Sequence, residues 1–170
     1  MKISIIKGNI TSLVVDAMVN AADPSLSGGG GVDGEIHRAA GPLLKEECLK
    51  IRREKYPKGL PTGEAVLTKG YNSKAKFIIH TVGPRFGVEN ISLLEDCYLN
   101  SLKLAEQNGC KTIAFPSIST GVYRVPIEKA SYIVKSVLDN YKSGIIKEII
   151  LVLHNDSDFR LYLEIFGKQE

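Results

Sequence analysis

The chain has 170 residues, a length typical of one domain that can bury its own hydrophobic core. Hydrophobic residues make up 44% and charged residues 24%, the composition of an ordinary soluble protein. The net charge of +3 is too small to indicate a nucleic-acid partner. The three cysteines, Cys48, Cys97 and Cys110, are odd in number and lack the paired spacing of metal ligands, so we expect a reduced protein without a bound metal.

Two further features bear on the location and partners of the protein. The apolar run at residues 3–6 is too short for a signal peptide, and no other run approaches the length of a membrane span. We therefore expect a cytoplasmic protein with no membrane partner. A basic cluster lies further along the chain, and we interpret it as the solvated end of a helix rather than a nucleic-acid surface. Its residues are Lys50, Arg52, Arg53, Lys55 and Lys58.

Apolar runs of strand length alternate with segments of helical period. The runs are mostly continuous and rich in β-branched residues, as strands buried on both faces require. We predict strands at residues 3–6, 17–21, 65–68, 77–82, 112–115 and 148–154. We predict helices at 33–53 (divided by Gly41 and Pro42), 91–108, 126–141 and 158–166. This alternation predicts an α/β sandwich of helix, sheet and helix layers with a largely parallel sheet.

Three unusual loops follow predicted strands directly, at residues 23–33, 116–123 and 154–158. Ligands of parallel α/β sheets bind outside the carboxyl ends of the strands, so we expect these loops to converge on one crevice. The first loop contains four consecutive glycines, Gly28–Gly31, directly before a helix start. Such a run lets a ligand approach the main chain, and the helix offers N–H groups to phosphate. The alternative is a flexible surface turn.

The second loop combines small residues, hydroxyl groups and Gly121 before a helix. It could cradle an anion with backbone N–H groups, or its hydroxyls could serve only turns and helix caps. The P-loop and the dinucleotide fingerprint are both absent. Asp33 is either a helix N-cap or first-turn acid, or a general base for a water beside a ribose. We expect His37 and His80 to be structural, and His154 to stack on a base.

Six segments, in order along nearly the whole chain, resemble the macro domain, specifically its MacroD-type branch that binds ADP-ribose. Several are weak individually, but together they are highly specific. They are Gly8-Asn9-Ile10-Thr11, Val15-Asp16-Ala17-Met18-Val19-Asn20-Ala21-Ala22, Gly28–Gly34 with Ile36-His37-Arg38-Ala39-Ala40-Gly41, Thr62-Gly63-Glu64-Ala65, Ile79-His80-Thr81-Val82-Gly83-Pro84, and Ala114-Phe115-Pro116-Ser117-Ile118-Ser119-Thr120-Gly121-Val122-Tyr123.

The resemblance implies a single macro domain over residues 1–170, with a mixed, mostly parallel sheet of about six strands between helices. It also implies ADP-ribose in a cleft at the strand ends, without a metal or redox cofactor. By position, Asn9 and Ile10 would meet the adenine, and His154 stands where relatives commonly place an aromatic residue. The residues implied along the rest of the ligand are Asn20, Gly30, Gly31, Val32 and Asp33 on one side and Ser119, Thr120, Gly121, Val122 and Tyr123 on the other.

Two positions depart from the family pattern. Asn9 replaces the usual aspartate, and its carbonyl can still accept a hydrogen bond from the adenine amino group, although more weakly. Asp23 replaces an asparagine that is thought to position the distal ribose. An ionised Asp23 could accept from ribose hydroxyls but could not donate, and it adds a second carboxylate near Asp33 and the diphosphate. Binding therefore survives this change more readily than catalysis.

The resemblance implies an enzyme that removes mono-ADP-ribose from acidic side chains or deacetylates O-acetyl-ADP-ribose. Water would attack at the modified distal ribose, activated either by Asp33, with Asp23 beside it, or by a phosphate of the substrate. The alternative is a reader module that binds ADP-ribose without cleaving it, because of Asp23. A nucleic-acid-binding domain is a third reading, which the lack of aromatic residues among the basic cluster disfavours. We expect a monomer whose partner is ADP-ribose or an ADP-ribosylated protein.

Overall fold

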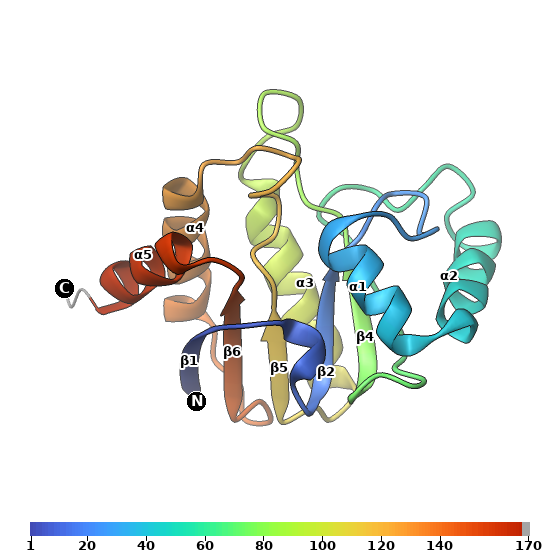
Figure 1. Cartoon of the computed structure of the whole chain (residues 1–170), viewed down its shortest axis with the longest axis horizontal. Helices are drawn as coiled ribbons and strands as arrows, with labels where there is room; N and C mark the ends of the chain where they lie inside the picture. The colour runs from blue at the N-terminus through green and yellow to red at the C-terminus, as the bar shows by residue number, and fades with distance from the viewer. Residues whose placement is uncertain (168–170) are drawn as a thin grey trace.

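The computed structural model describes residues 1–167, and these contain a six-stranded sheet with helices on both sides (Figure 1). The strands lie in the order β1-β6-β5-β2-β4-β3. Their bounds are β1 Lys2–Lys7, β2 Val15–Ala21, β3 Ala65–Lys69, β4 Ala75–Thr81, β5 Thr112–Phe115 and β6 Glu148–Leu153. Only the pairing of β3 with β4 is antiparallel, and the other four pairings are parallel. The predicted mixed, mostly parallel sheet is confirmed.

Helices cover both faces of the sheet and complete the predicted three layers. Helices α1 (Gly31–Ala40) and α2 (Pro42–Glu54) pack on one face. Helices α3 (Leu93–Gln107), α4 (Ile127–Asn140) and α5 (Asp156–Gly167) pack on the other. Within β2, Ala17 and Val19 face the second group, whereas Met18 faces the first. This alternation follows from the two-residue period of a strand.

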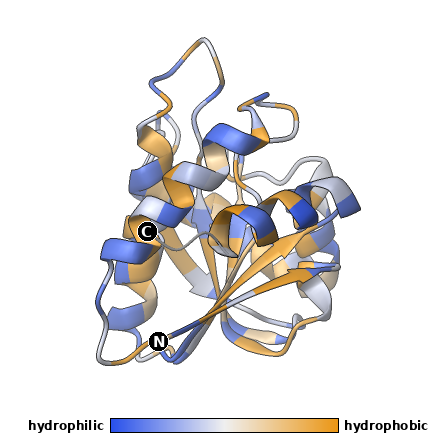
Figure 2. Cartoon of the chain, turned by 90° about the vertical axis from the view of Figure 1, so that its left-hand side faces the viewer, coloured by the Kyte–Doolittle hydropathy of each residue, from blue (hydrophilic) through white to orange (hydrophobic). Residues whose placement is uncertain are grey.

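The division between core and surface explains why the strands could be recognised in the sequence. Figure 2 shows hydrophobic residues concentrated along the strands, while the helices are hydrophobic on only part of their surface. The central strands β2, β4 and β5 are buried between helix layers and therefore read as continuous apolar runs. Their carboxyl ends all open on the same edge of the sheet, because the three strands are parallel.

Several element boundaries differ from the predictions. Helix α1 begins at Gly31, two residues earlier than predicted, because Gly30 is its N-cap and accepts the first helical hydrogen bond from Gly34. The last strand ends at Leu153, so His154 lies just beyond it. A short 3₁₀ helix, η1 (Ile10–Ser12), was not predicted. No helix within residues 1–167 is long and apolar enough to cross a membrane.

Candidate active site

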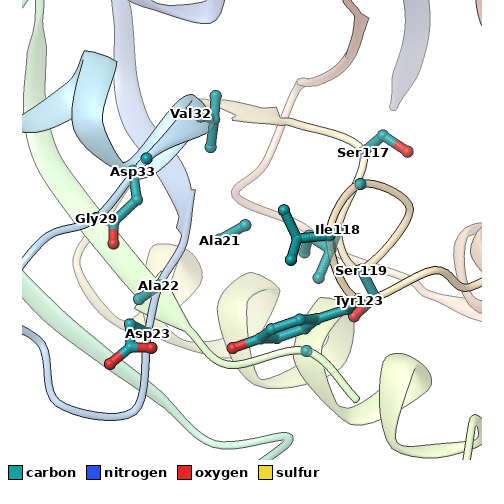
Figure 3. A pocket seen from close by; sticks show the side chains of 15 residues that line it. Ala21, Ala22, Asp23, Gly29, Val32, Asp33, Ser117, Ile118, Ser119 and Tyr123 are labelled. Atoms are coloured by element: carbon teal, nitrogen blue, oxygen red, sulfur yellow. The ribbon is translucent and has the colours of Figure 1, made fainter. Parts of the chain in front are cut away.

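A cavity of about 350 Å³ opens at the carboxyl ends of the central strands (Figure 3). The loop at residues 23–33 forms one wall, and the loop at 116–123 forms the other. The loop after β4 contributes Gly83. The predicted convergence of the first two loops is confirmed. The lining residues are Ala21, Ala22, Asp23, Gly29, Gly30, Gly31, Val32, Asp33, Gly83, Ser117, Ile118, Ser119, Gly121, Val122 and Tyr123.

A second cavity of about 330 Å³ adjoins the first and shares Gly31, Val32, Ser117 and Gly121 with it. The third loop enters here through His154 and Asn155, and Asp158 follows in the first turn of α5. The two cavities therefore form one elongated cleft along the sheet edge. Its other lining residues in this half are Gly8, Asn9, Ile10, Glu35, Pro116, Thr120 and Val152.

The glycine run forms the floor between the two cavities. A Cβ atom on Gly34 would lie 2.5 Å from the carbonyl oxygen of Gly29, so only glycine lets the loop fold back on α1. The first turn of α1 presents the N–H groups of Gly31, Val32 and Asp33, which have no acceptor within the helix. Together with the helix dipole, these donors make the floor suitable for an anion.

The opposite wall depends on a close approach between two loops. Ser119 has a positive φ of 68°, and its buried Oγ has no hydrogen-bond partner among residues 1–167. A Cβ atom on Gly83 would lie 2.0 Å from this Oγ, which explains the glycine. Ser117 Oγ and Thr120 Oγ1 are 2.6 Å apart and close the turn at the start of the loop. This wall is therefore a fixed structure rather than a loose turn.

Asp33 lies in the first turn of α1 and is not its N-cap. Its side chain lines the first cavity although the residue is only 5% exposed. Asn20 Nδ2 donates a 2.8 Å hydrogen bond to Asp33 Oδ1. Burial raises the pKa of Asp33, and the hydrogen bond from Asn20 partly opposes this effect. A buried carboxyl with a raised pKa, aimed at a cavity, is a candidate general base.

His37 lies closer to this carboxylate than the sequence indicated. It follows Asp33 by one turn of α1, and its Nε2 is 3.4 Å from Asp33 Oδ1. Burial lowers the pKa of His37, whereas the charge of Asp33 acts in the opposite direction. The helical spacing of four residues predicts such a contact.

A buried polar chain supports Asp33 from below. Asn20 of β2 pairs directly with His80 of β4, and their Nδ2 and Nδ1 atoms are 3.1 Å apart. Because the amide nitrogen of Asn20 only donates, His80 accepts at Nδ1 and carries its proton on Nε2, 3.0 Å from Thr68 Oγ1. Burial lowers the pKa of His80 to about 3, which keeps the ring neutral. The structural role predicted for His80 is consistent with its buried contacts to Asn20, Thr68 and, 3.7 Å from Nε2, Cys48 Sγ.

The chain fixes the orientation of the Asn20 side chain. Both hydrogens of Nδ2 are used, one by Asp33 and one by His80. The buried Oδ1 of Asn20 has no hydrogen-bond partner within residues 1–167. Asn20 does not line either cavity. The resemblance implies that Asn20 contacts the ligand, but in the structure it lies behind Asp33.

Asp23 lies at the mouth of the first cavity and is exposed. Its Oδ2 accepts hydrogen bonds from Ser25, at 3.0 Å from the backbone nitrogen and 2.5 Å from Oγ. An asparagine oxygen could also accept both bonds, although more weakly than a carboxylate. Figure 3 shows the ring of Tyr123 extending across the cavity toward Ala22 and Asp23. Burial raises the pKa of Tyr123, and the charge of Asp23 adds to this effect.

The second cavity contains the residues expected at the adenine. Ile10 is buried and His154 is exposed on its rim. Asn9 caps η1, and its Oδ1 accepts hydrogen bonds from the backbone nitrogen of Thr11 at 3.0 Å and from Thr11 Oγ1 at 2.8 Å. Both lone pairs of this oxygen are therefore occupied. A bond to an adenine amino group would have to replace one of them.

The structure brings together all predicted site residues except Asn20, which stands behind the wall. Val122 lies at the rim and is 93% exposed. The sequence reading did not single out individual wall residues such as Ala21, Gly83 and Ile118, although each belongs to a quoted motif. It also missed Asn155 and Asp158, which the Asx-type capping pattern before α5 could have indicated. Within residues 1–167, no group of three or more His, Cys, Asp and Glu side chains could hold a metal.

The chain is similar in sequence to known proteins over the segments that form the cleft. The Macro domain family model matches residues 19–134. The O-acetyl-ADP-ribose deacetylase of Escherichia fergusonii is 50% identical, over 99% of this chain and 97% of that protein. The corresponding protein of Escherichia coli K12 is 43% identical over the same shares.

Solved structures give the same result at the level of the fold. The Oceanobacillus iheyensis macrodomain with ADP has a TM-score of 0.92 and 39% identity, over 96% of this chain and 88% of that one. The Trypanosoma brucei macrodomain in complex with ADP-ribose has a TM-score of 0.87 and 38% identity, over 97% and 69%. By its match to the family model and by these relatives, the chain belongs to the macro domain family.

Proposed function

We propose that this protein is a hydrolase that binds ADP-ribose, deacetylates O-acetyl-ADP-ribose and removes mono-ADP-ribose from acidic side chains. The observation that carries this proposal is the buried Asp33 carboxyl at the wall of a cleft with an anion-binding floor. The names of the deacetylase relatives support the same activity.

The two cavities match the two ends of ADP-ribose. The second cavity would take the adenine, with Ile10 below it and His154 against its face. The diphosphate would lie over the first turn of α1, between Gly31 and the loop that carries Ser119 and Gly121. This order places the distal ribose in the first cavity, beside Asp33.

The chemistry assigned to Asp33 is proton removal from water. As Asp33 accepts the proton, the water oxygen bonds to the carbonyl carbon of the ester that links the acyl group to the distal ribose. The bond between this carbon and the ribose oxygen then breaks. The proton then passes to that oxygen, so the products are ADP-ribose and a free carboxylic acid. A raised pKa makes the carboxylate a better base near neutral pH. Asn20 and His80 act as positioning residues, because Asn20 holds Asp33, His80 holds Asn20, and neither lines the cavity.

A second candidate function is that of a reader that binds ADP-ribose without cleaving it. Asp23 favours this function because its ionised carboxylate cannot donate to a ribose hydroxyl and lies near the expected diphosphate. Its local bonds to Ser25 leave it at the cavity mouth. In either case, we propose a single domain over residues 1–170 that acts as a cytoplasmic monomer.

The test is to incubate the purified protein with O-acetyl-ADP-ribose and to follow acetate release, with ADP-ribose binding measured by calorimetry in parallel. Saturable binding with acetate release supports the hydrolase. The reader function is supported if the protein binds ADP-ribose but releases neither acetate from O-acetyl-ADP-ribose nor ADP-ribose from a protein modified on glutamate. The absence of any binding would overturn both functions.

A further inference from the structure

A third cavity continues from the first on the side away from the adenine. It has a volume of about 640 Å³ and shares Asp23, Gly83 and Tyr123 with the first cavity. Its walls carry three cationic side chains, Arg52, Lys58 and Arg85. Nothing in the proposed binding of ADP-ribose uses this space, because the ligand ends beside Asp33.

The basic side of this cavity is fixed to the loop that carries Asp23. Arg52 lies in the last turn of α2 and donates through Nη1 to the carbonyl oxygens of Tyr56 and Pro57. The next turn is held to the first loop by a 2.9 Å hydrogen bond from the Leu60 nitrogen to the Pro24 oxygen. Leu60 is also fully buried. These contacts set the basic residues at a fixed place beside the mouth of the first cavity.

The cavity lining carries three cationic side chains against two carboxylates, Asp23 and Glu89, so one positive charge is in excess. Glu89 is already paired, since both of its carboxylate oxygens lie within 3.2 Å of Arg85 Nε. Lys58 is exposed and has no ion-pair partner within the described part of the chain. The buried Nε of Arg52 has no hydrogen-bond partner there either. Because Arg85 is paired with Glu89, the positive excess lies on the side of Arg52 and Lys58, where the exposed ammonium of Lys58 can meet an acidic group.

The position of the third cavity indicates which part of a substrate would enter it. A substituent on the distal ribose leaves the first cavity past Asp23 and Tyr123, which are the residues that the two cavities share. An acetyl group adds only two carbons to the ribose, whereas a modified protein carries its main chain and neighbouring side chains past Asp23 and Tyr123 into this space. We propose that the third cavity binds an acidic segment of the ADP-ribosylated protein, an inference that rests on the proposed hydrolase function.

The test uses two synthetic peptides that carry one ADP-ribose through a linkage resistant to hydrolysis. One peptide has Glu and Asp on both sides of the modified position, and the other has Gln and Asn. By calorimetry at low salt, we expect the acidic peptide to bind about fivefold more tightly, and this preference to shrink as salt screens the charges. Lys58→Gln should remove most of the preference. Lys58 is exposed, so this change leaves the core intact.

Lys55→Gln is the matched control, because Lys55 is an exposed neighbour on the same helix end and does not line the cavity. It should leave the preference unchanged. Equal binding of the two peptides, or a preference that Lys58→Gln does not reduce, would overturn the inference while leaving the hydrolase function intact. Failure of free ADP-ribose to bind would instead overturn the proposed function, and the inference with it.

Discussion

The two ends of the cleft are built in different ways. At the first cavity, Asp33 and its partner Asn20 are buried, and Asn20 in turn contacts the buried His80 of β4. At the second cavity, Asn9 and His154 are exposed, and Asn9 makes only local contacts that cap a short helix. One end is thus anchored in the core, whereas the other is a surface of short-range turns.

This difference indicates that the first cavity carries the chemistry and the second cavity contributes to recognition of the ligand. Burial shifts the pKa of Asp33 and of His80, because removing a group from water penalises its charged form. An exposed side chain such as His154 instead offers contact area to a ligand. Substitutions at the first cavity should therefore change turnover strongly, and substitutions at the second should change affinity modestly.

Among the substitutions that test this difference between the two cavities, Asp33→Asn should have the largest effect. The asparagine keeps an oxygen that can accept from Asn20 Nδ2, but it cannot take a proton from water. We expect turnover of O-acetyl-ADP-ribose to fall about 1000-fold, the size of a general-base contribution, while the Kd for ADP-ribose changes less than about threefold. Steady-state kinetics and calorimetry measure the two. Full activity in the variant would assign water activation to a phosphate of the substrate instead.

The next prediction concerns the polar chain beneath the first cavity. Below its ordinary pKa of 6.5, the His80 ring takes up a proton in the unfolded chain, whereas in the folded protein it does so only near pH 3. The free energy of unfolding should therefore decrease as the pH falls from 6.5 toward 3. We expect this contribution to be on the order of 3 kcal/mol, since a pKa unit corresponds to about 1.4 kcal/mol and relaxation of the site reduces the full difference.

Urea denaturation of the wild type and of His80→Gln across this pH range measures the effect. The variant should be less stable at pH 7, because the chain from Thr68 to Asn20 is altered, but its stability should vary less between pH 6.5 and 3. Asp33 contributes in the opposite direction in both proteins, since its raised pKa favours the folded state at low pH. Parallel pH profiles for the two proteins would contradict the buried, neutral state of His80.

The same contrast between core and surface decides what the sequence could reveal. The strands of the sheet and the meeting of the three loops follow from apolar runs and from the rule for parallel sheets, so they were predictable. The pairing of Asn20 with His80 was not, because it depends on the register between strands that lie 60 residues apart in the chain. The strand pattern alone marks both residues only as polar positions inside apolar runs.

Local capping was equally hard to foresee. Asp33 could be the N-cap of a helix or a residue of its first turn, and only the start of α1 at Gly31 decides between them. The resemblance likewise implies Asn9 at the adenine, and in the structure Asn9 lines the second cavity with its oxygen bonded to Thr11. In both cases the residue type was informative, but its partner depended on one or two residues of chain geometry.

At the second cavity, His154→Ala should weaken ADP-ribose binding about fivefold, the loss expected for one stacking contact with a base. Turnover at saturating substrate should stay the same, because His154 lies outside the first cavity. Titration with ADP-ribose and with ribose 5-phosphate separates the contributions, since only the former has an adenine. A similar loss for both ligands would place the effect elsewhere than at the base.

The smallest expected effect lies at the mouth of the first cavity, where an exposed residue meets the buried end of the cleft. Asp23→Asn removes a carboxylate from the neighbourhood of the diphosphate and adds an amide donor for a ribose hydroxyl, while its oxygen can still accept from Ser25. We expect ADP-ribose to bind about threefold more tightly at low salt, with a smaller gain at high salt. Calorimetry at two salt concentrations measures both values.

Asp139→Asn is the control for net charge, since Asp139 lies on α4 and lines neither cavity of the cleft. It should leave the affinity for ADP-ribose unchanged. Weaker binding in Asp23→Asn would mean that the carboxylate itself holds the ribose, and Asp23 would then belong with Asp33 to the reactive end of the cleft. Tighter binding together with faster turnover would instead mean that the site is otherwise complete and that the charge of Asp23 limits it. The exposed carboxylate of Asp23 would then act on the ligand directly, without a buried partner that holds it in place.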